Sequence, residues 1–89
     1  MKIKDGFNIK VEDGITFVVC DKSSNRNFTA NIQLTDTSTF LWKLLKSGDK
    51  TKEQMLNALL QEFDISAVLA LNNIDVFIRT LKENGIIEE

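Results

Sequence analysis

The hydrophobic period of the chain changes once, near residue 35, and no other feature of the sequence constrains the fold as strongly. Between residues 7 and 34, segments of alternating apolar and polar residues are typical of strands that bury one face. From residue 35 to residue 85, apolar residues recur every three to four positions, which is the pattern of amphipathic helices. The sequence therefore predicts strands first and helices afterwards.

Three strands are expected in the first part of the chain. Residues 7–11 (FNIKV) alternate strictly, while residues 15–20 (ITFVVC) are mostly apolar and β-branched, as in a central strand. Asp13-Gly14 between them is a strong signal for a tight hairpin. Residues 28–34 (FTANIQL) alternate again. The simplest arrangement is an antiparallel meander with the second strand in the middle.

Three helices are expected after the strands. Thr35 can cap the first helix, Gly48 would end it in a left-handed conformation, and Thr51 opens a capping box for the second. Ser66 can cap a third and longest helix that runs until Gly85, after which the chain is expected to tail off. The predicted fold is therefore α+β, with a three-stranded antiparallel sheet followed by three helices (β-β-β-α-α-α).

One apolar stripe on each helix is expected to face the core. The stripes are Phe40, Leu41, Leu44 and Leu45, then Met55, Leu56, Leu59, Leu60 and Phe63, then Ala67, Ala70, Leu71, Ile74, Phe77, Ile78 and Leu81. Trp42 is interpreted as part of the core or as a hydrophobic lid, rather than as an anchor for a ligand.

Length and composition are those of a small globular protein. With 89 residues, the chain is expected to form one domain over residues 1–89. No apolar run approaches the roughly 20 residues that span a bilayer, and the first ten residues lack the apolar segment of a secretion signal. The lack of such a run predicts no membrane partner. Since the lone Cys20 cannot form an internal disulfide, we expect a reducing cytoplasmic location.

Catalytic side chains are scarce. The chain has no histidine, the commonest general base and metal ligand, and Cys20 is its only thiol. Neither a Cys-His pair nor a histidine-containing triad can therefore form. The four glycines are isolated in sequence, so no phosphate-binding loop is present. We expect neither an enzyme nor a metal site, which leaves a binding function.

The predicted order of elements resembles a winged helix-turn-helix domain with its sheet placed first, and this raises the alternative of a DNA-binding regulator. A recognition helix normally carries surplus Lys and Arg, because it meets phosphates. The third helix has Arg79 and Lys82 against Asp75 and Glu83, so its positive and negative charges balance. We therefore expect no nucleic-acid partner, and the regulator stays an alternative.

The third expected strand is an unguarded edge. The outer strands of a sheet are usually protected by charge, proline or bulges, because their open main-chain groups invite pairing. The first strand contains Lys10, with Lys4 and Asp5 just before it, whereas residues 27–35 contain no charge and no proline. Such an edge suits β-augmentation, in which a peptide adds as a further strand. The alternatives are that a loop or helix of the same chain covers the edge, or that a homodimer pairs through it as a structural module.

The third helix offers a second surface. At about 100° per residue, Leu69, Val76 and Thr80 fall together on the side away from its core stripe, where charged or strongly polar residues are expected. Asn73, Phe77 and Thr80 lie between the two sides. These residues are candidates for the wall of a groove.

The run IQLTDTSTFLWKLLKSGDKTKEQMLNALLQEFDIS, followed by VFIRTLKENGII, resembles the PqqD family, whose members carry the recognition element for ribosomally made, post-translationally modified peptides. The resemblance covers the whole chain, strands included. Its most specific residues are Leu34, Thr35, Phe40, Leu41, Trp42, Gly48, Thr51, Phe63, Asp64, Gly85, Ile86 and Ile87. Thr35 stands where the family more often has Asn, and since both residues are good N-caps the helix start is preserved.

The resemblance implies a peptide chaperone that performs no chemistry and needs no metal or cofactor. Such proteins bind the leader segment of a precursor peptide as a strand beside the third strand, in a groove against the third helix. They hand the precursor to a modifying enzyme, which in the PQQ pathway is a radical SAM protein that joins a Glu and a Tyr side chain. The pathway, PQQ or another modified peptide, and the state, monomer or homodimer, stay open.

The predicted peptide-binding site combines the edge strand with the third helix. Its strand residues are Ala30, Asn31, Ile32, Gln33 and Leu34, which would bind through the main chain. Its helix residues are Asn73, Val76, Phe77 and Thr80. If the N–H of Ile32 points outward, Ile32→Pro is expected to weaken peptide binding.

Overall fold

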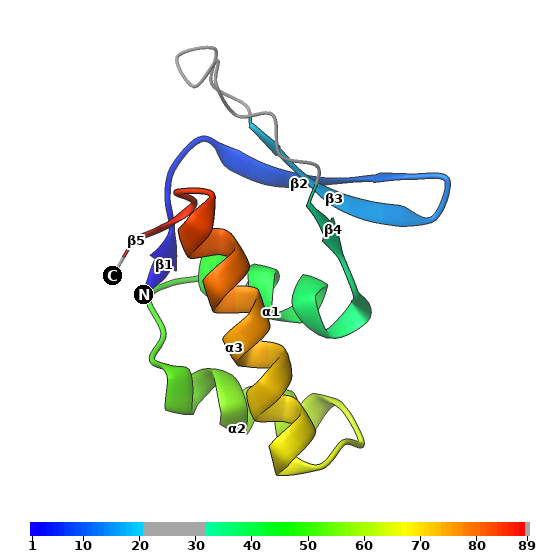
Figure 1. The fold of residues 1–89 in the computed structure, drawn as a ribbon, viewed down its shortest axis with the longest axis vertical. Coiled ribbons are helices and arrows are strands. Elements are labelled where there is room, and N and C mark those ends of the chain that lie inside the picture. Colours follow the sequence, from blue (N-terminus) through cyan, green and yellow to red (C-terminus); the bar gives the residue numbers. More distant parts are fainter. Residues whose placement is uncertain (21–31, 89) are drawn as a thin grey trace.

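Three strands and three helices follow one another in the predicted order, and two further strands lie near the chain ends (Figure 1). The computed structural model describes residues 1–20 and 32–88. Its elements are β1 (Lys2–Ile3), β2 (Phe7–Glu12), β3 (Ile15–Cys20), β4 (Gln33–Leu34), α1 (Asp36–Lys46), α2 (Lys52–Glu62), α3 (Ala67–Glu83) and β5 (Ile87–Glu88). The prediction of an α+β fold, with a three-stranded antiparallel sheet followed by three helices, is confirmed.

β2 and β3 form a hairpin around a two-residue loop. Asp13 and Gly14 both have positive φ angles, of 52° and 77°. Two consecutive positive φ angles are typical of a type I′ turn, whose twist matches that of the flanking strands. Glu12 pairs with Ile15 directly beside the loop, so β2 runs one residue further than expected. The predicted hairpin is confirmed.

β4 pairs with β3 and completes the strand order β2-β3-β4. Its two residues lie opposite Phe17 and Thr16. Just before β4, the carbonyl oxygen of Ile32 accepts a hydrogen bond of 3.0 Å from the N–H of Val18. Residues 28–31 of the expected third strand lie outside the described residues. Within the described part of the chain, the second strand is therefore central, as predicted.

Each helix begins where the sequence predicts a cap. The side chains of Thr35 and Ser66 each accept a hydrogen bond from the backbone N–H three residues later, at the starts of α1 and α3. Thr51 and Gln54 form the reciprocal capping box expected for α2. Each cap satisfies a backbone N–H that the helix leaves unpaired and stabilises the fold by about 1 kcal/mol.

The C-terminal ends of α1 and α3 differ. At the end of α3, Gly85 has a φ of 68°, its N–H donates to the carbonyl of Lys82, and the N–H of Ile86 donates to that of Leu81. These two bonds form a Schellman motif. Gly48 follows the end of α1 with a φ of 155°, far from the left-handed helical value near about 57°. Gly48 therefore ends the helix, but not in the conformation that the sequence predicts.

A second sheet joins the first and last described strands, and Figure 1 shows β1 and β5 side by side. Ile3 of β1 lies opposite Ile87 of β5. The backbone N–H of Lys4 adds a 2.8 Å hydrogen bond to the carbonyl of Ile86. The expectation that the chain tails off after Gly85 is wrong, because the Schellman turn directs two apolar residues back into the core.

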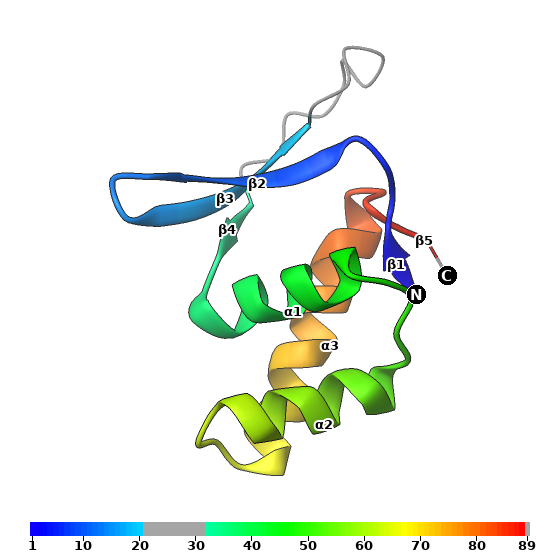
Figure 2. The same cartoon turned by 180° about the vertical axis from the view of Figure 1, so that it is seen from behind.

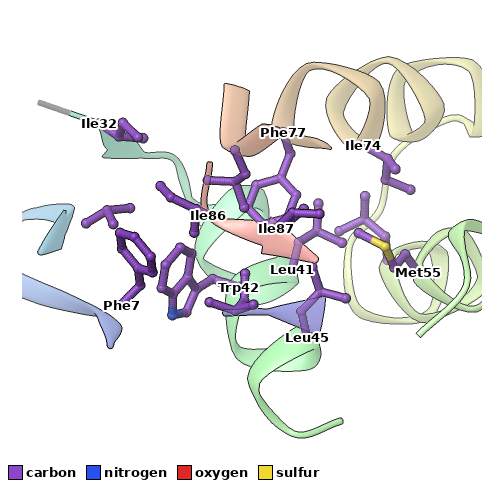
Figure 3. Packing of buried hydrophobic residues seen from close by; sticks show 14 of the residues in the cluster. Phe7, Ile32, Leu41, Trp42, Leu45, Met55, Ile74, Phe77, Ile86 and Ile87 are labelled. Atoms are coloured by element: carbon purple, nitrogen blue, oxygen red, sulfur yellow. The ribbon is translucent and has the colours of Figure 1, made fainter. Parts of the chain in front are cut away.

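One cluster of buried apolar side chains connects both sheets with the three helices (Figure 3). Trp42 is 1% exposed and lies beside Phe7 of β2, so its interpretation as a core residue is confirmed. The other fully buried large side chains are Leu41, Leu45, Met55, Leu59, Ile74, Leu81 and Ile86. Leu60, Ala67 and Leu71 were expected in the core but are exposed. Leu60 and Leu71 lie at the margins of their stripes, and Ala67 is the first residue of α3.

The three helices lie on the same side of the β2–β3 hairpin, as the two ribbon views show (Figures 1 and 2). β4 leads from the sheet to the start of α1. In both views α3 runs beyond the level at which β4 ends, toward α2. The sheet is thus connected to the helical layer through the same short strand that forms its outer edge.

Candidate functional site

β4 is an edge strand, since among the described residues β3 is its only neighbour. Main-chain groups point alternately to the two sides of a strand. Because the carbonyl of Ile32 accepts a bond from β3 and Leu34 lies opposite Thr16, the main chains of Ile32 and Leu34 face β3. The N–H and C=O of Gln33 therefore point away from the sheet. The open main chain is that of Gln33, not that of Ile32.

A pocket of about 160 Å³ lies between β4, the start of α1 and the second half of α3. Its lining residues are Ile32, Gln33, Leu34, Thr35, Ser38, Val76, Phe77, Thr80 and Leu81. The sheet contributes one wall and α3 the other. The open edge of β4 and a concave surface thus occur at the same place in the fold.

Most of the predicted site residues line this pocket. The strand residues Ile32, Gln33 and Leu34 lie on one side, and the helix residues Val76, Phe77 and Thr80 lie on the other. Asn73 is half-buried on α3 and does not line the pocket. Ala30 and Asn31 lie outside the described residues. The structure therefore brings the strand and helix residues together without Asn73.

Three lining residues were not among the predicted site residues. Thr35 was interpreted only as a helix cap and Leu81 only as core, and Ser38 was given no role. Thr35 follows the edge strand directly, and Ser38 lies one helical turn further. That proximity was the only signal in the sequence that could have included them.

The pocket is uncharged, because none of its lining residues is ionisable. Its hydroxyl groups are partly engaged already, since the Thr35 Oγ1 donates to the Ser38 Oγ at 3.1 Å and accepts from the Ser38 N–H at 3.2 Å. Phe77 and Leu81 supply its apolar floor and are 3% and 0% exposed. Such a surface favours an uncharged ligand with an apolar side chain and a main chain that can pair with Gln33.

A cluster of metal-binding side chains does not occur in the described part of the chain. No group of three His, Cys, Asp or Glu residues there could hold a metal ion. The α-amino group of Met1, which forms an ion pair with Asp49, holds the pKa of that carboxyl below its usual value, but this pair lies outside the pocket. Among the described residues, no helix is long and apolar enough to cross a membrane.

Comparison with known proteins places the chain in a family. Residues 27–87 match the family model described as coenzyme PQQ synthesis protein D (PqqD). Among solved structures, the fold is similar to that of TbiB1 in complex with the TbiA(beta) leader peptide, with a TM-score of 0.72 over 99% of this chain and 95% of that chain, at 20% sequence identity. No curated protein shows significant similarity to the sequence. Because the family model covers well over half of the chain, this protein belongs to the PqqD family.

Proposed function

We propose that the protein binds the leader segment of a ribosomally synthesised precursor peptide and presents it to a modifying enzyme. The observation that carries this proposal is the outward main chain of Gln33, which lies at the rim of the uncharged pocket. The leader segment adds to the sheet as a fourth strand beside β4. In this function, residues 1–89 act as one peptide-recognition domain.

Strand addition explains why the edge and the pocket occur together. A peptide that pairs with β4 exchanges main-chain hydrogen bonds with Gln33, and alternate side chains of the peptide then point to opposite faces of the sheet. Those on the helical face enter the pocket between Leu34 and Val76. The main-chain bonds supply affinity for any extended peptide, and the pocket supplies specificity.

The size of the pocket limits the side chain that it can accept. A cavity of about 150 Å³ with an apolar lining is known to bind benzene. The pocket here measures about 160 Å³ and is lined largely by apolar side chains, among them Ile32, Phe77 and Leu81. We therefore expect one phenyl-sized or branched aliphatic side chain of the leader to occupy it.

Two comparisons support the proposal. The family model is named after a protein of coenzyme PQQ synthesis, and the similar solved structure is a complex with a leader peptide. Since the chain has no histidine and a single cysteine, we assign the chemistry to a partner enzyme. We propose a radical SAM protein as this partner, in PQQ synthesis or in the synthesis of another modified peptide.

The test begins with the neighbouring genes, where we expect a short precursor peptide and a modifying enzyme. Titration of that precursor into isotope-labelled protein should shift the NMR signals of residues 32–35 and 76–81. Shifts confined to other residues would move the site elsewhere. A protein that forms a dimer and ignores the precursor would instead support a dimerising module that pairs through β4.

A further inference from the structure

An uncharged stripe extends from the pocket along α3. Leu69, Asn73, Val76 and Thr80 fall within about 60° of one another around the helix axis, at about 100° per residue. Leu69 and Val76 are apolar and yet 48% and 43% exposed. The stripe contains no ionisable residue, although an exposed helix face normally carries charge. We call these four residues the α3 stripe.

The α3 stripe lies on the side of the helix that faces β4. Val76 and Thr80 belong to it, and both line the pocket. Asp75 lies on another side of the helix, where its carboxylate forms an ion pair with Lys52 of α2. The first half of the stripe, Leu69 and Asn73, is not part of the pocket. It continues the same helix face toward the α2 end of the molecule.

This first half lies beyond the end of β4. In both ribbon views, β4 ends beside the upper half of α3, whose other half continues downward toward α2 (Figures 1 and 2). A peptide that pairs with the edge of β4 and stays extended leaves the pocket in this direction along the helix. One peptide chain can therefore contact both the pocket and the first half of the α3 stripe, although the sheet contributes only to the pocket.

We propose that the leader peptide is recognised at two positions, the pocket and the exposed side chain of Leu69. The proposal rests on the proposed function and extends its site by half the length of α3. The pocket-lining segment of α3 has its middle near Ile78. Leu69 lies nine residues before Ile78, and nine residues of helix correspond to about 14 Å along the axis. An extended peptide covers that distance with about four residues, at about 3.3 Å each. The leader thus carries two apolar side chains about four residues apart.

Asn73 lies between the two positions and can bind the peptide main chain. Its side chain is half-buried, and among the described residues it makes no hydrogen bond to the protein. A carboxamide offers both a donor and an acceptor, which is what an extended peptide presents beyond the end of β4. The absence of charge along the α3 stripe means that the peptide segment between the two apolar residues is uncharged, because a buried charge there would find no partner.

Val68 provides a matched control for Leu69. It is the preceding residue on α3, it is also apolar, and it is 79% exposed. It lies about 100° around the helix from Leu69, outside the α3 stripe. Leu69→Glu and Val68→Glu therefore add the same charge to the same helical turn, but only Leu69→Glu places it against the proposed peptide.

The probe is a displayed library of random peptides of about twelve residues, long enough to cover β4 and the α3 stripe. On the unmodified protein we expect enriched peptides with two apolar positions about four residues apart and no acidic residue between them. On Leu69→Glu, enrichment at one of the two positions should disappear, and affinity for the best peptide should fall by about five- to tenfold. On Val68→Glu, pattern and affinity should stay unchanged.

The outcomes separate this inference from the proposed function. A library that yields no binders to the unmodified protein contradicts peptide binding itself. If the peptides enriched on the unmodified protein share only one apolar position, the contact at Leu69 is contradicted and the proposed function stays intact. The same holds if the peptides enriched on Leu69→Glu keep both apolar positions. If Leu69→Glu and Val68→Glu lose affinity for the best peptide equally, and circular dichroism shows that both variants are folded, the inference is also overturned. The loss would then be an effect of the added charge alone.

Discussion

The substitution Gln33→Pro tests the open edge with little damage to the fold. Proline has no N–H and is tolerated in edge strands where the N–H faces solvent. The N–H of Gln33 points away from β3, and its side chain is exposed, so the substitution removes no ladder hydrogen bond and no core packing. We expect the free energy of unfolding to change by less than about 1 kcal/mol.

Binding should respond much more strongly than folding. The incoming peptide loses one main-chain hydrogen bond, and the carbonyl that would have accepted it is left without a partner beside the pocket. An unsatisfied carbonyl costs about 1–3 kcal/mol when it is fully buried. Since the edge is partly exposed, we expect about 1–2 kcal/mol, which raises Kd roughly five- to thirtyfold. Isothermal titration calorimetry with the precursor peptide measures this change.

Val11→Pro is the matched control on the opposite edge of the same sheet. The strand register pairs Lys10 with Phe17 and makes the main chain of Val11 point away from β3, just as that of Gln33 does. Val11 is also 63% exposed. We expect wild-type affinity from this variant. If Gln33→Pro is folded and binds the precursor within about twofold of the wild-type Kd, the peptide does not pair with β4.

Three further outcomes follow from the structure. Because the pocket is uncharged, the Kd for the precursor should change less than about twofold between roughly 50 and 200 mM salt, whereas a DNA-binding regulator would lose about a thousandfold in affinity. Trp42→Ala should lower the free energy of unfolding by about 3–5 kcal/mol in chemical denaturation, because it empties the centre of the core. Gly85→Ala should cost about 1 kcal/mol in the same assay, and Gly85→Asn less, because Asn tolerates the positive φ of that residue; equal costs would contradict the Schellman explanation.

The parts of the fold that the sequence predicts well are those set by neighbouring residues. Thr35, Thr51 and Ser66 begin the three helices because a side-chain oxygen reaches an N–H three residues away. The Asp13-Gly14 turn depends on the same short range. None of these features needs a partner from elsewhere in the chain, and each can therefore be predicted from a few consecutive residues.

The pairing of β1 with β5 could not be predicted in this way. Each strand has only two residues, too few to show alternation, and their partners lie at opposite ends of the described chain. So short a strand is stable only when it packs against a larger core, and one side chain of each strand is buried there. Ile3, Ile86 and Ile87 are buried in that core. In the sequence, however, one of them is a single apolar residue and the other two are a pair among polar residues, which predicts no strand.

The candidate site was predictable in outline and not in detail. The lack of charge in residues 27–35 predicted an open edge at β4. Helical periodicity predicted that Val76 and Thr80 lie on an outer face of α3, where charged or strongly polar residues are expected. Which main-chain groups point outward depends on the register with β3, and so Ile32 was a poor choice for substitution by proline. Which side of α3 meets β4 depends on packing between elements far apart in sequence, and so Asn73 was included in the wall of the pocket.

Phe77 shows why recognition and folding are only partly separable in this protein. It is 3% exposed and belongs to the core cluster, yet it also lines the pocket. If the leader peptide binds in this pocket as proposed, a change at Phe77 is expected to alter both the free energy of unfolding and the affinity for the peptide. Val76 is its neighbour in sequence and lines the same pocket, but 43% of it is exposed, so its substitution removes little core packing. We therefore expect that substitutions at Val76 and Leu69 can change the specificity for leader peptides without loss of the fold, while Phe77 and Leu81 keep the floor of the pocket constant.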